Sequence, residues 1–228
     1  MRLLLSALSK FVMGIFLVGM LLFLPAGSFG FVNGWLFIGL LFIPMLPLGA
    51  VLFIKAPALL EKRLNAKEKE GTQKGVVAVT GILFIAGFAV AGLDFRYDLS
   101  YVPAWAVILA SVLLLVSYAL YAEVMRENAY LSRTVEVTEG QRVVDTGLYG
   151  IVRHPMYAVT ILLFLSIPIV LGSWWSLLCF LPYVPVIIIR VINEEKFLER
   201  ELDGYTEYKR RVKYRLWCHN RTRYRAAA

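Results

Sequence analysis

Residues 153–195 read RHPMYAVTILLFLSIPIVLGSWWSLLCFLPYVPVIIIRVINEE. No charged side chain interrupts this stretch between His154 and Arg190, and the pair Gly172-Ser173 marks a turn near its middle. Each half is somewhat shorter than the roughly 20 apolar residues that a helix needs to cross a bilayer core. We therefore predict a tight hairpin of two membrane segments, at 156–171 and 174–189, whose polar ends meet at one membrane face.

Four further apolar runs precede this hairpin, at 11–24, 35–54, 76–93 and 102–122. Hydrophobic residues make up 59% of the 228-residue chain, charged residues make up only 18%, and the mean hydropathy is +0.68. This composition excludes an ordinary water-soluble domain. We predict an all-α, polytopic integral membrane helix bundle with about six membrane segments.

The basic residues indicate the topology, because short cytoplasmic loops of membrane proteins collect Lys and Arg. The formal net charge is +8, and of the 24 Lys and Arg residues only Arg96 falls on the other side of the predicted bundle. This asymmetry predicts that both termini face the cytoplasm, and we expect the inner membrane of a prokaryote. The basic side would attract anionic lipid head groups. No recognition element accompanies the charge, so we predict no nucleic-acid partner.

The hydropathy pattern divides the chain into four regions. A four-span N-terminal membrane region covers 1–125, a polar connector covers 126–155, the C-terminal hairpin covers 156–192, and a cytoplasmic helix with a basic tail covers 193–228. The last region is predicted to begin as an amphipathic helix, which Gly204 ends or interrupts.

Two cysteines and two histidines are too few for a disulfide framework or a protein-bound metal. Cys179 lies in an apolar run and Cys218 in the basic tail, so both thiols are expected to be reduced. Neither His154 nor His219 belongs to a metal-binding motif, and we predict no metal.

The first candidate site lies where the connector enters the hairpin, at Arg153-His154-Pro155. Proline disfavours a helical conformation for the residue before it and suits the first position of a helix, so His154 is predicted at the N-cap. The backbone N–H groups that follow, together with Arg153 and His154, would form a cationic helix mouth for a carboxylate or phosphate.

The second candidate site lies where the hairpin leaves the membrane, at Arg190, Glu194 and Glu195. Arg190 and Glu194 are four residues apart, so they share a helix face. Because a tight hairpin places its two polar ends side by side, we expect His154 and the two glutamates to face one cavity. A cationic helix mouth and a carboxylate pair together suit a zwitterionic ligand.

The ordered motif G-L-Y-G-I-V-R-H-P-M-Y, a hydrophobic hairpin, R-x-x-x-E-E-x-x-L and G-Y-x-x-Y resembles the isoprenylcysteine carboxyl methyltransferase family and the related phospholipid N-methyltransferases. The resemblance covers 143–212. It implies an integral membrane enzyme that uses S-adenosylmethionine on the cytoplasmic side and takes a lipid or prenylated small-molecule acceptor from the bilayer. It also implies catalytic roles for Arg190, which matches the arginine associated with the acceptor carboxylate, and for Glu194. The implied cofactor-binding residues are Tyr149, Arg153, His154, Pro155, Tyr157, Glu194 and Glu195.

The acceptor does not follow from the motif, because the first four spans match the family in hydropathy alone. A carboxylate acceptor, which we favour, is ionised at neutral pH and needs only an arginine to hold it. An amine acceptor needs a base, such as Glu194, Glu195 or a neutral His154. Two other classes stay open: a membrane reductase of isoprenoids or sterols with a nicotinamide cofactor, and a non-enzymatic membrane accessory protein.

The same residues also have purely structural interpretations. His154 can serve as a helix cap, and Arg153 and Arg190 can be anchors that extend toward the lipid head groups. For Tyr205 and Tyr208 we favour a role as interfacial aromatic residues, and for the basic tail we favour a lipid-facing or solvated segment.

Overall fold

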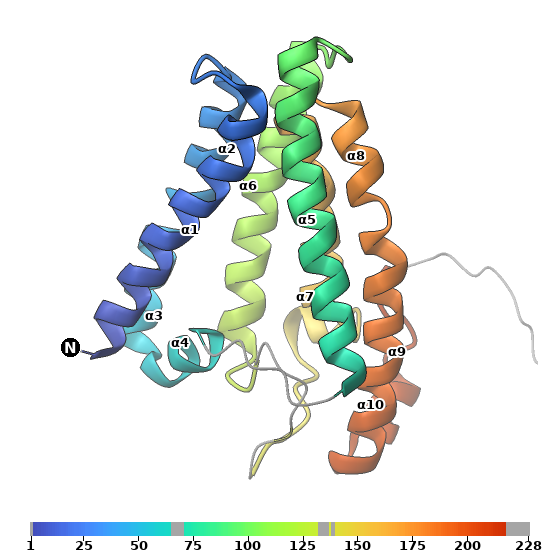
Figure 1. The fold of residues 1–228 in the computed structure, drawn as a ribbon. Coiled ribbons are helices and arrows are strands. Elements are labelled where there is room, and N and C mark those ends of the chain that lie inside the picture. Colours follow the sequence, from blue (N-terminus) through green and yellow to red (C-terminus); the bar gives the residue numbers. More distant parts are fainter. Residues whose placement is uncertain (1, 65–70, 132–136, 138–139, 218–228) are drawn as a thin grey trace, which may run out of the picture.

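The computed structural model describes residues 2–64, 71–131, 137 and 140–217. In this part of the chain, five segments are long and apolar enough to cross a membrane, and a sixth apolar helix is shorter. The predicted polytopic helical membrane architecture is confirmed. The helices, shown in Figure 1, are α1 Arg2–Ala26, α2 Val32–Phe42, α3 Met45–Lys55, α4 Pro57–Leu64, α5 Gly71–Tyr97, α6 Ala104–Glu127, the 3-10 helix η1 Gly147–Gly150, α7 Pro155–Val170, α8 Trp174–Phe180, α9 Tyr183–Glu201 and α10 Tyr205–Arg211.

Helices that follow one another in sequence are not always neighbours in the bundle. Helix α5 packs mainly against α1 and α8, whereas α6 packs mainly against α7, and α5 and α6 make little contact with each other. Close packing of α5 and α8 depends on Gly87, since a Cβ atom at this position would overlap the ring of Phe180. The C-terminal hairpin therefore lies between the two preceding spans and joins them.

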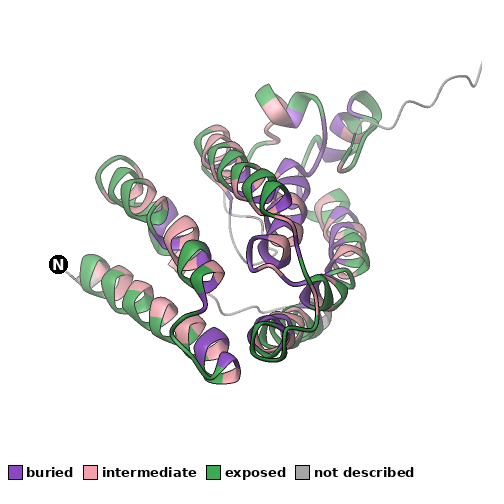
Figure 2. Ribbon diagram, turned by 90° about the horizontal axis from the view of Figure 1, so that it is seen from above, coloured by how far each residue is buried: buried purple, intermediate pink, exposed green. Residues whose placement is uncertain are grey.

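Aromatic rings fill the centre of the bundle. The ring of Phe84 on α5 meets those of Phe164 on α7 and Phe180 on α8 edge to face, with centroids 4.6 Å and 5.0 Å away. Such contacts add to the stabilisation from apolar burial. Figure 2 shows the complementary pattern on the outside, where the helix that starts at the N-terminus is largely exposed, as expected for a surface that meets lipid tails.

The last predicted span is divided into two helices. Helix α8 ends at Phe180, and α9 starts at Tyr183 after Pro182. Helix α9 then carries the chain out of the apolar region without a break to Glu201, so the predicted amphipathic helix is a continuation of the last span. Gly204, with a φ of 82°, separates α9 from α10, and its predicted interruption of the helix is confirmed.

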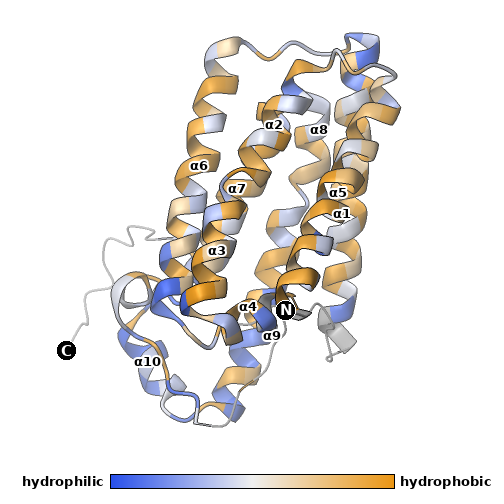
Figure 3. Ribbon diagram, turned by 90° about the vertical axis from the view of Figure 1, so that its left-hand side faces the viewer, coloured by the Kyte–Doolittle hydropathy of each residue, from blue (hydrophilic) through white to orange (hydrophobic). Residues whose placement is uncertain are grey.

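The two ends of the bundle differ in chemistry. The start of α1, together with α4 and α10, lies at one end, and hydrophilic residues gather there (Figures 1 and 3). At the other end, the buried carboxylate of Asp94 accepts hydrogen bonds from the hydroxyls of Ser100 and Ser173. Ser173 in turn accepts from the backbone N–H of Ser176 and caps α8. A buried polar network therefore holds this end of the bundle.

Candidate functional site

His154 occupies the predicted N-cap position of α7. Its φ of −126° and ψ of 62° are outside the helical range, and Pro155 takes the first helical position. The His154 carbonyl oxygen accepts hydrogen bonds from the N–H groups of Tyr157 and Ala158, both at 3.2 Å. The imidazole makes no capping hydrogen bond, so it points elsewhere.

The carboxylate of Glu195 on α9 is the centre of a buried ionic network. Its Oε1 atom accepts a hydrogen bond from Arg153 Nε at 2.8 Å and lies 3.3 Å from His154 Nε2. Its Oε2 atom accepts from Arg215 Nε at 2.9 Å. Glu195 is only 2% exposed, and a charge this buried is tolerated when it is paired and hydrogen-bonded. The imidazole of His154 and the carboxylate of Glu195 therefore meet as predicted, but Glu195 lies behind the imidazole and does not face the cavity, so the expectation that both glutamates face it is correct for Glu194 alone.

Arg153 is held from a second direction by the C-terminal part of the chain, residues 212–217, which we call the strap. Arg153 Nη1 donates to the carbonyl oxygens of Val212 and Lys213, at 2.7 and 3.0 Å. The backbone N–H groups of Arg153 and His154 donate to carbonyl oxygens of the strap, at 2.8 and 2.9 Å. The charge of Arg153 is thus compensated inside the protein, which differs from the open cationic helix mouth expected from the sequence.

A second polar chain links α7 and α9. Arg190 Nε donates to the hydroxyl oxygen of Tyr157 at 2.8 Å, and that hydroxyl donates to Glu194 Oε2 at 2.5 Å. Arg190 is 8% exposed although it carries a charge. The four-residue spacing of Arg190 and Glu194 places both on the helix face that meets Tyr157.

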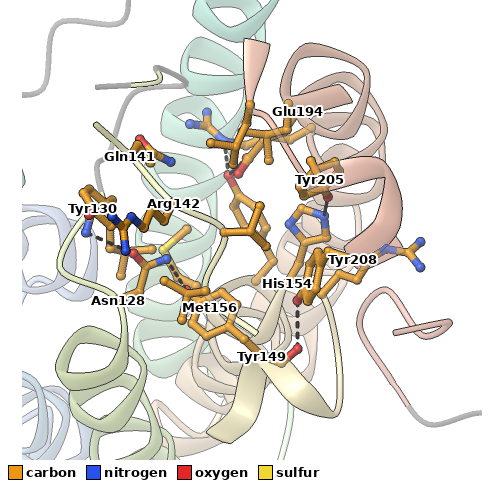
Figure 4. A pocket seen from close by; sticks show the side chains of 18 residues that line it. Asn128, Tyr130, Gln141, Arg142, Tyr149, His154, Met156, Glu194, Tyr205 and Tyr208 are labelled. Carbon is orange, nitrogen blue, oxygen red and sulfur yellow. Dashed lines mark hydrogen bonds between the residues drawn. The ribbon is translucent and has the colours of Figure 1, made fainter. Parts of the chain in front are cut away.

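These groups border a cavity that opens at the hydrophilic end of the bundle. It contains about 830 Å³ of empty space, including the part open to solvent. Figure 4 shows Asn128, Tyr130, Gln141 and Arg142 on one side of the cavity and His154, Tyr205 and Tyr208 on the other. The lining residues are Asn128, Tyr130, Leu131, Gln141, Arg142, Val143, Val144, Tyr149, Arg153, His154, Met156, Tyr157, Arg190, Glu194, Leu198, Leu202, Tyr205 and Tyr208.

Tyr205 and Tyr208 are part of the cavity wall, so the interpretation of these residues as interfacial aromatics is wrong. They are 3% and 2% exposed. Tyr208 donates to the carbonyl oxygen of Tyr149 at 2.8 Å, and the Tyr205 hydroxyl lies 3.5 Å from His154 Nε2. Burial raises the pKa of both tyrosines above the ordinary value of 10.0.

The structure divides the residues that the sequence analysis selected into two groups. Six of them line the cavity: Tyr149, Arg153, His154, Tyr157, Arg190 and Glu194. Pro155 and Glu195 lie outside the lining, Pro155 as the first residue of α7 and Glu195 behind the imidazole. Both therefore support the wall from outside the cavity.

Several cavity residues were missed by the sequence analysis. Asn128, Tyr130, Gln141 and Arg142 come from the polar connector, where no motif distinguishes them from ordinary loop residues. Arg215 was assigned to a lipid-facing or solvated tail, yet it pairs with Glu195. The spacing of Tyr205 and Tyr208 was a usable signal, because residues three apart on a helix face the same side.

Among the described residues, no group of three or more His, Cys, Asp or Glu side chains is arranged to hold a metal ion. Cys179 lies on α8 as a half-buried free thiol. Cys218 and His219 lie outside the described residues.

Comparison with known families supports the resemblance noted from the motif. Residues 105–203 match the family model described as phospholipid methyltransferase, a stretch that runs from α6 to just beyond α9. A search of curated proteins found no match to the chain. The matched stretch includes His154, Tyr157, Arg190 and both glutamates.

Proposed function

We propose that this protein transfers a methyl group from S-adenosylmethionine to a lipid-like acceptor in the membrane, with a carboxylate of the isoprenylcysteine type as the favoured acceptor. The observation that carries the proposal is the joining of Arg190, Tyr157 and Glu194 by hydrogen bonds in one cavity with His154. These residues lie within the stretch that matches the methyltransferase family.

The cavity chemistry fits S-adenosylmethionine, which supplies a methyl group on a positively charged sulfonium. Tyrosine rings from four separate elements line the cavity, and aromatic faces attract cations. The carboxylate of Glu194 adds a negative charge. Tyr149, His154, Tyr157 and Glu194 would contact the cofactor, while Arg153, Pro155 and Glu195 would hold the imidazole and the start of α7 in place.

Arg190 has the properties needed to orient an anionic acceptor. Its guanidinium group is buried and lines the cavity, and Tyr157 fixes its Nε atom. Arginine binds carboxylates through two parallel hydrogen bonds, which fixes their direction as well as their position. An ionised carboxylate needs no base, so positioning and the exclusion of water would provide most of the rate acceleration.

An amine acceptor is the second candidate, supported by the description of the matched family and by Glu194. Methylation of an ammonium group requires removal of a proton before the nitrogen lone pair can attack. Glu194 lies in the cavity next to Tyr157 and would take that proton. The two candidates therefore use the same cavity but differ in whether Glu194 acts as a base.

The cavity end would face the cytoplasm in this proposal, in the inner membrane of a prokaryote. The charge distribution supports this orientation, since the start of α1 and the basic helix α10 lie at the cavity end, whereas Arg96 terminates α5 at the other end.

The proposal is tested with purified protein in nanodiscs, methyl-labelled S-adenosylmethionine and membrane lipid extract. We expect label in a lipid fraction, and its release by mild base identifies an ester, whereas stable label identifies an N-methyl product. Glu194→Gln and Arg190→Gln should each reduce incorporation roughly 10- to 100-fold, since the first removes a charged contact to the cofactor or the amine and the second a charged contact to the acceptor. Glu201→Gln, at the exposed end of α9, is the matched control and should retain activity.

Two outcomes would overturn the proposal. One is the absence of any labelled lipid together with the absence of saturable binding of S-adenosylhomocysteine. The other is competition for the cavity by a nicotinamide dinucleotide but not by S-adenosylhomocysteine, which would support the reductase alternative.

A further inference from the structure

Three arginines line the cavity, and they differ in what they bind within the protein. Arg153 pairs with Glu195 and with carbonyl oxygens of the strap, and Arg190 donates to Tyr157. Arg142, on the connector, forms no hydrogen bond or ion pair with any residue that the structure describes. Its positive charge therefore lies at the cavity without an anionic partner from the described parts of the chain.

The cavity also has one carboxylate that the protein satisfies only in part. Glu194 Oε2 accepts the hydrogen bond from Tyr157, whereas Oε1 has no hydrogen bond within the described residues. Glu195, its neighbour in sequence, differs because both of its oxygens are occupied by basic side chains. Glu194 is thus available for a ligand cation, and Glu195 is not.

Arg142 and Glu194 come from different elements, the connector and α9, and both line the same cavity (Figure 4). Among the described residues, the guanidinium group of Arg142 has no ion-pair partner and the Oε1 atom of Glu194 has no hydrogen-bond partner. Arg142 is exposed and Glu194 is half-buried, so both charged groups are accessible to a ligand that enters the cavity. A ligand that carries an anion and a cation a few bonds apart would form charge-assisted hydrogen bonds with both. The amino-acid end of S-adenosylmethionine, with its α-carboxylate and α-ammonium groups, has this chemistry.

We infer that Arg142 and Glu194 form a subsite for the amino-acid end of the cofactor, in which Arg142 binds the α-carboxylate and Glu194 the α-ammonium group. This inference rests on the proposed function. It moves the anion-binding role that the sequence suggested for Arg153 to a connector residue outside the motif. Asn128 and Gln141 extend the same polar wall beside Arg142, as expected for the hydrophilic end of a ligand.

An anionic group of the lipid acceptor is the other possible partner of Arg142, and the position of Arg142 argues against it. Arg142 belongs to the connector at the hydrophilic end of the protein, whereas the acceptor would enter from the apolar spans. Arg190, at the end of the hydrophobic part of α9, is closer in sequence to those spans and is the better contact for the acceptor.

Binding measurements with two ligands test the subsite without reference to activity. Isothermal titration of the nanodisc protein would compare S-adenosylhomocysteine with its decarboxylated analogue. We expect Arg142→Gln to weaken S-adenosylhomocysteine roughly 10- to 100-fold, the loss of one charged hydrogen-bonding contact, and to leave binding of the analogue unchanged. The unmodified protein should bind the analogue more weakly by a similar factor.

Arg126→Gln is the matched control, because Arg126 is near the connector but pairs with Glu123 and lies outside the cavity lining. It should bind both ligands like the unmodified protein. Equal losses for both ligands in Arg142→Gln, or no loss for either, would overturn the subsite. So would unchanged cofactor affinity with a raised KM for the acceptor, which would assign Arg142 to the lipid anion. Absence of saturable S-adenosylhomocysteine binding in the unmodified protein would instead contradict the proposed function itself.

Discussion

Replacing Glu195 with Gln tests whether the ionic network holds the site together, because it removes the negative charge and keeps the size of the side chain. The side chains of Arg153 and Glu195 are 5% and 3% exposed, so the variant leaves a buried guanidinium group without its counterion. Removing one partner of a buried ion pair costs about 3–5 kcal/mol. Arg153 keeps two carbonyl acceptors in the strap, so we expect about 3 kcal/mol.

The pair with Arg215 adds little to this value. The Arg215 side chain is 48% exposed, and exposed ion pairs contribute about 0–1 kcal/mol. The free energy of unfolding is measured by chemical denaturation in detergent micelles, with Glu201→Gln on the same helix as a control that should stay within about 0.5 kcal/mol of the unmodified protein. Equal stability of the Glu195 and Glu201 variants would refute the reasoning, because the network would then carry no net stabilisation.

A double variant separates the ion pair from the rest of the network. Arg153→Gln alone leaves Glu195 with a nearby imidazole and Arg215, whereas Arg153→Gln combined with Glu195→Gln leaves two neutral amides that can bond to each other. We therefore expect the double variant to be more stable than the sum of the two single losses predicts, with a coupling energy of at least about 1 kcal/mol. Simple additivity would show that the two side chains do not act as a pair.

Three further changes test the packing and the polar ends. Gly87→Val should destabilise the protein by about 1–3 kcal/mol in chemical denaturation, because its side chain overlaps Phe180, and an unchanged midpoint would contradict the packing of α5 on α8. Asp94→Ala should cost about 1–3 kcal/mol in the same assay, since two hydroxyls lose their acceptor, and full stability would contradict that network. Burial raises the folded-state pKa of Tyr205 and Tyr208 above 10.0, so their contribution to stability is complete below pH 10 and is lost as the pH rises through the folded-state pKa values. A base titration followed by tyrosine absorbance should show that both ionise at a higher pH than an exposed tyrosine. Ionisation at the ordinary pH would contradict their burial.

Much of the fold could be predicted from the sequence because the bilayer imposes a simple length rule on apolar helices. The apolar runs correspond to the observed spans, and the Arg153-His154-Pro155 sequence correctly predicts where α7 begins. The hairpin argument also places His154 near Glu195, since two short segments with one turn have little freedom. Rules on helix length, helix starts and turns were sufficient to predict the structure where a short connection determines which segments lie side by side.

The failures arise where neighbours are determined by packing between distant segments. Hydropathy does not reveal that α5 packs on α1 and α8 while α6 packs on α7, because lipid-facing and helix-facing surfaces are both apolar. The strap is a second example: Arg215 reads as one of many basic residues, and its pairing with Glu195 depends on a chain reversal after α9. Tyr205 and Tyr208 were predicted to be interfacial residues for the same reason, because the chain reversal that buries them is not evident from the sequence.

The continuous helix α9 has a consequence for the proposed reaction. Arg190 and Glu194 are one turn apart on this helix, which corresponds to about 6 Å along its axis. In the proposed function the first binds the acceptor and the second binds the cofactor, so one helix determines the separation of the two ligands. Tyr157, from α7, bonds to both side chains and fixes their directions. Because α9 is a rigid helix that carries both contacts, it keeps the two ligands in the orientation that an in-line displacement requires. A small membrane protein could therefore position two substrates with few residues.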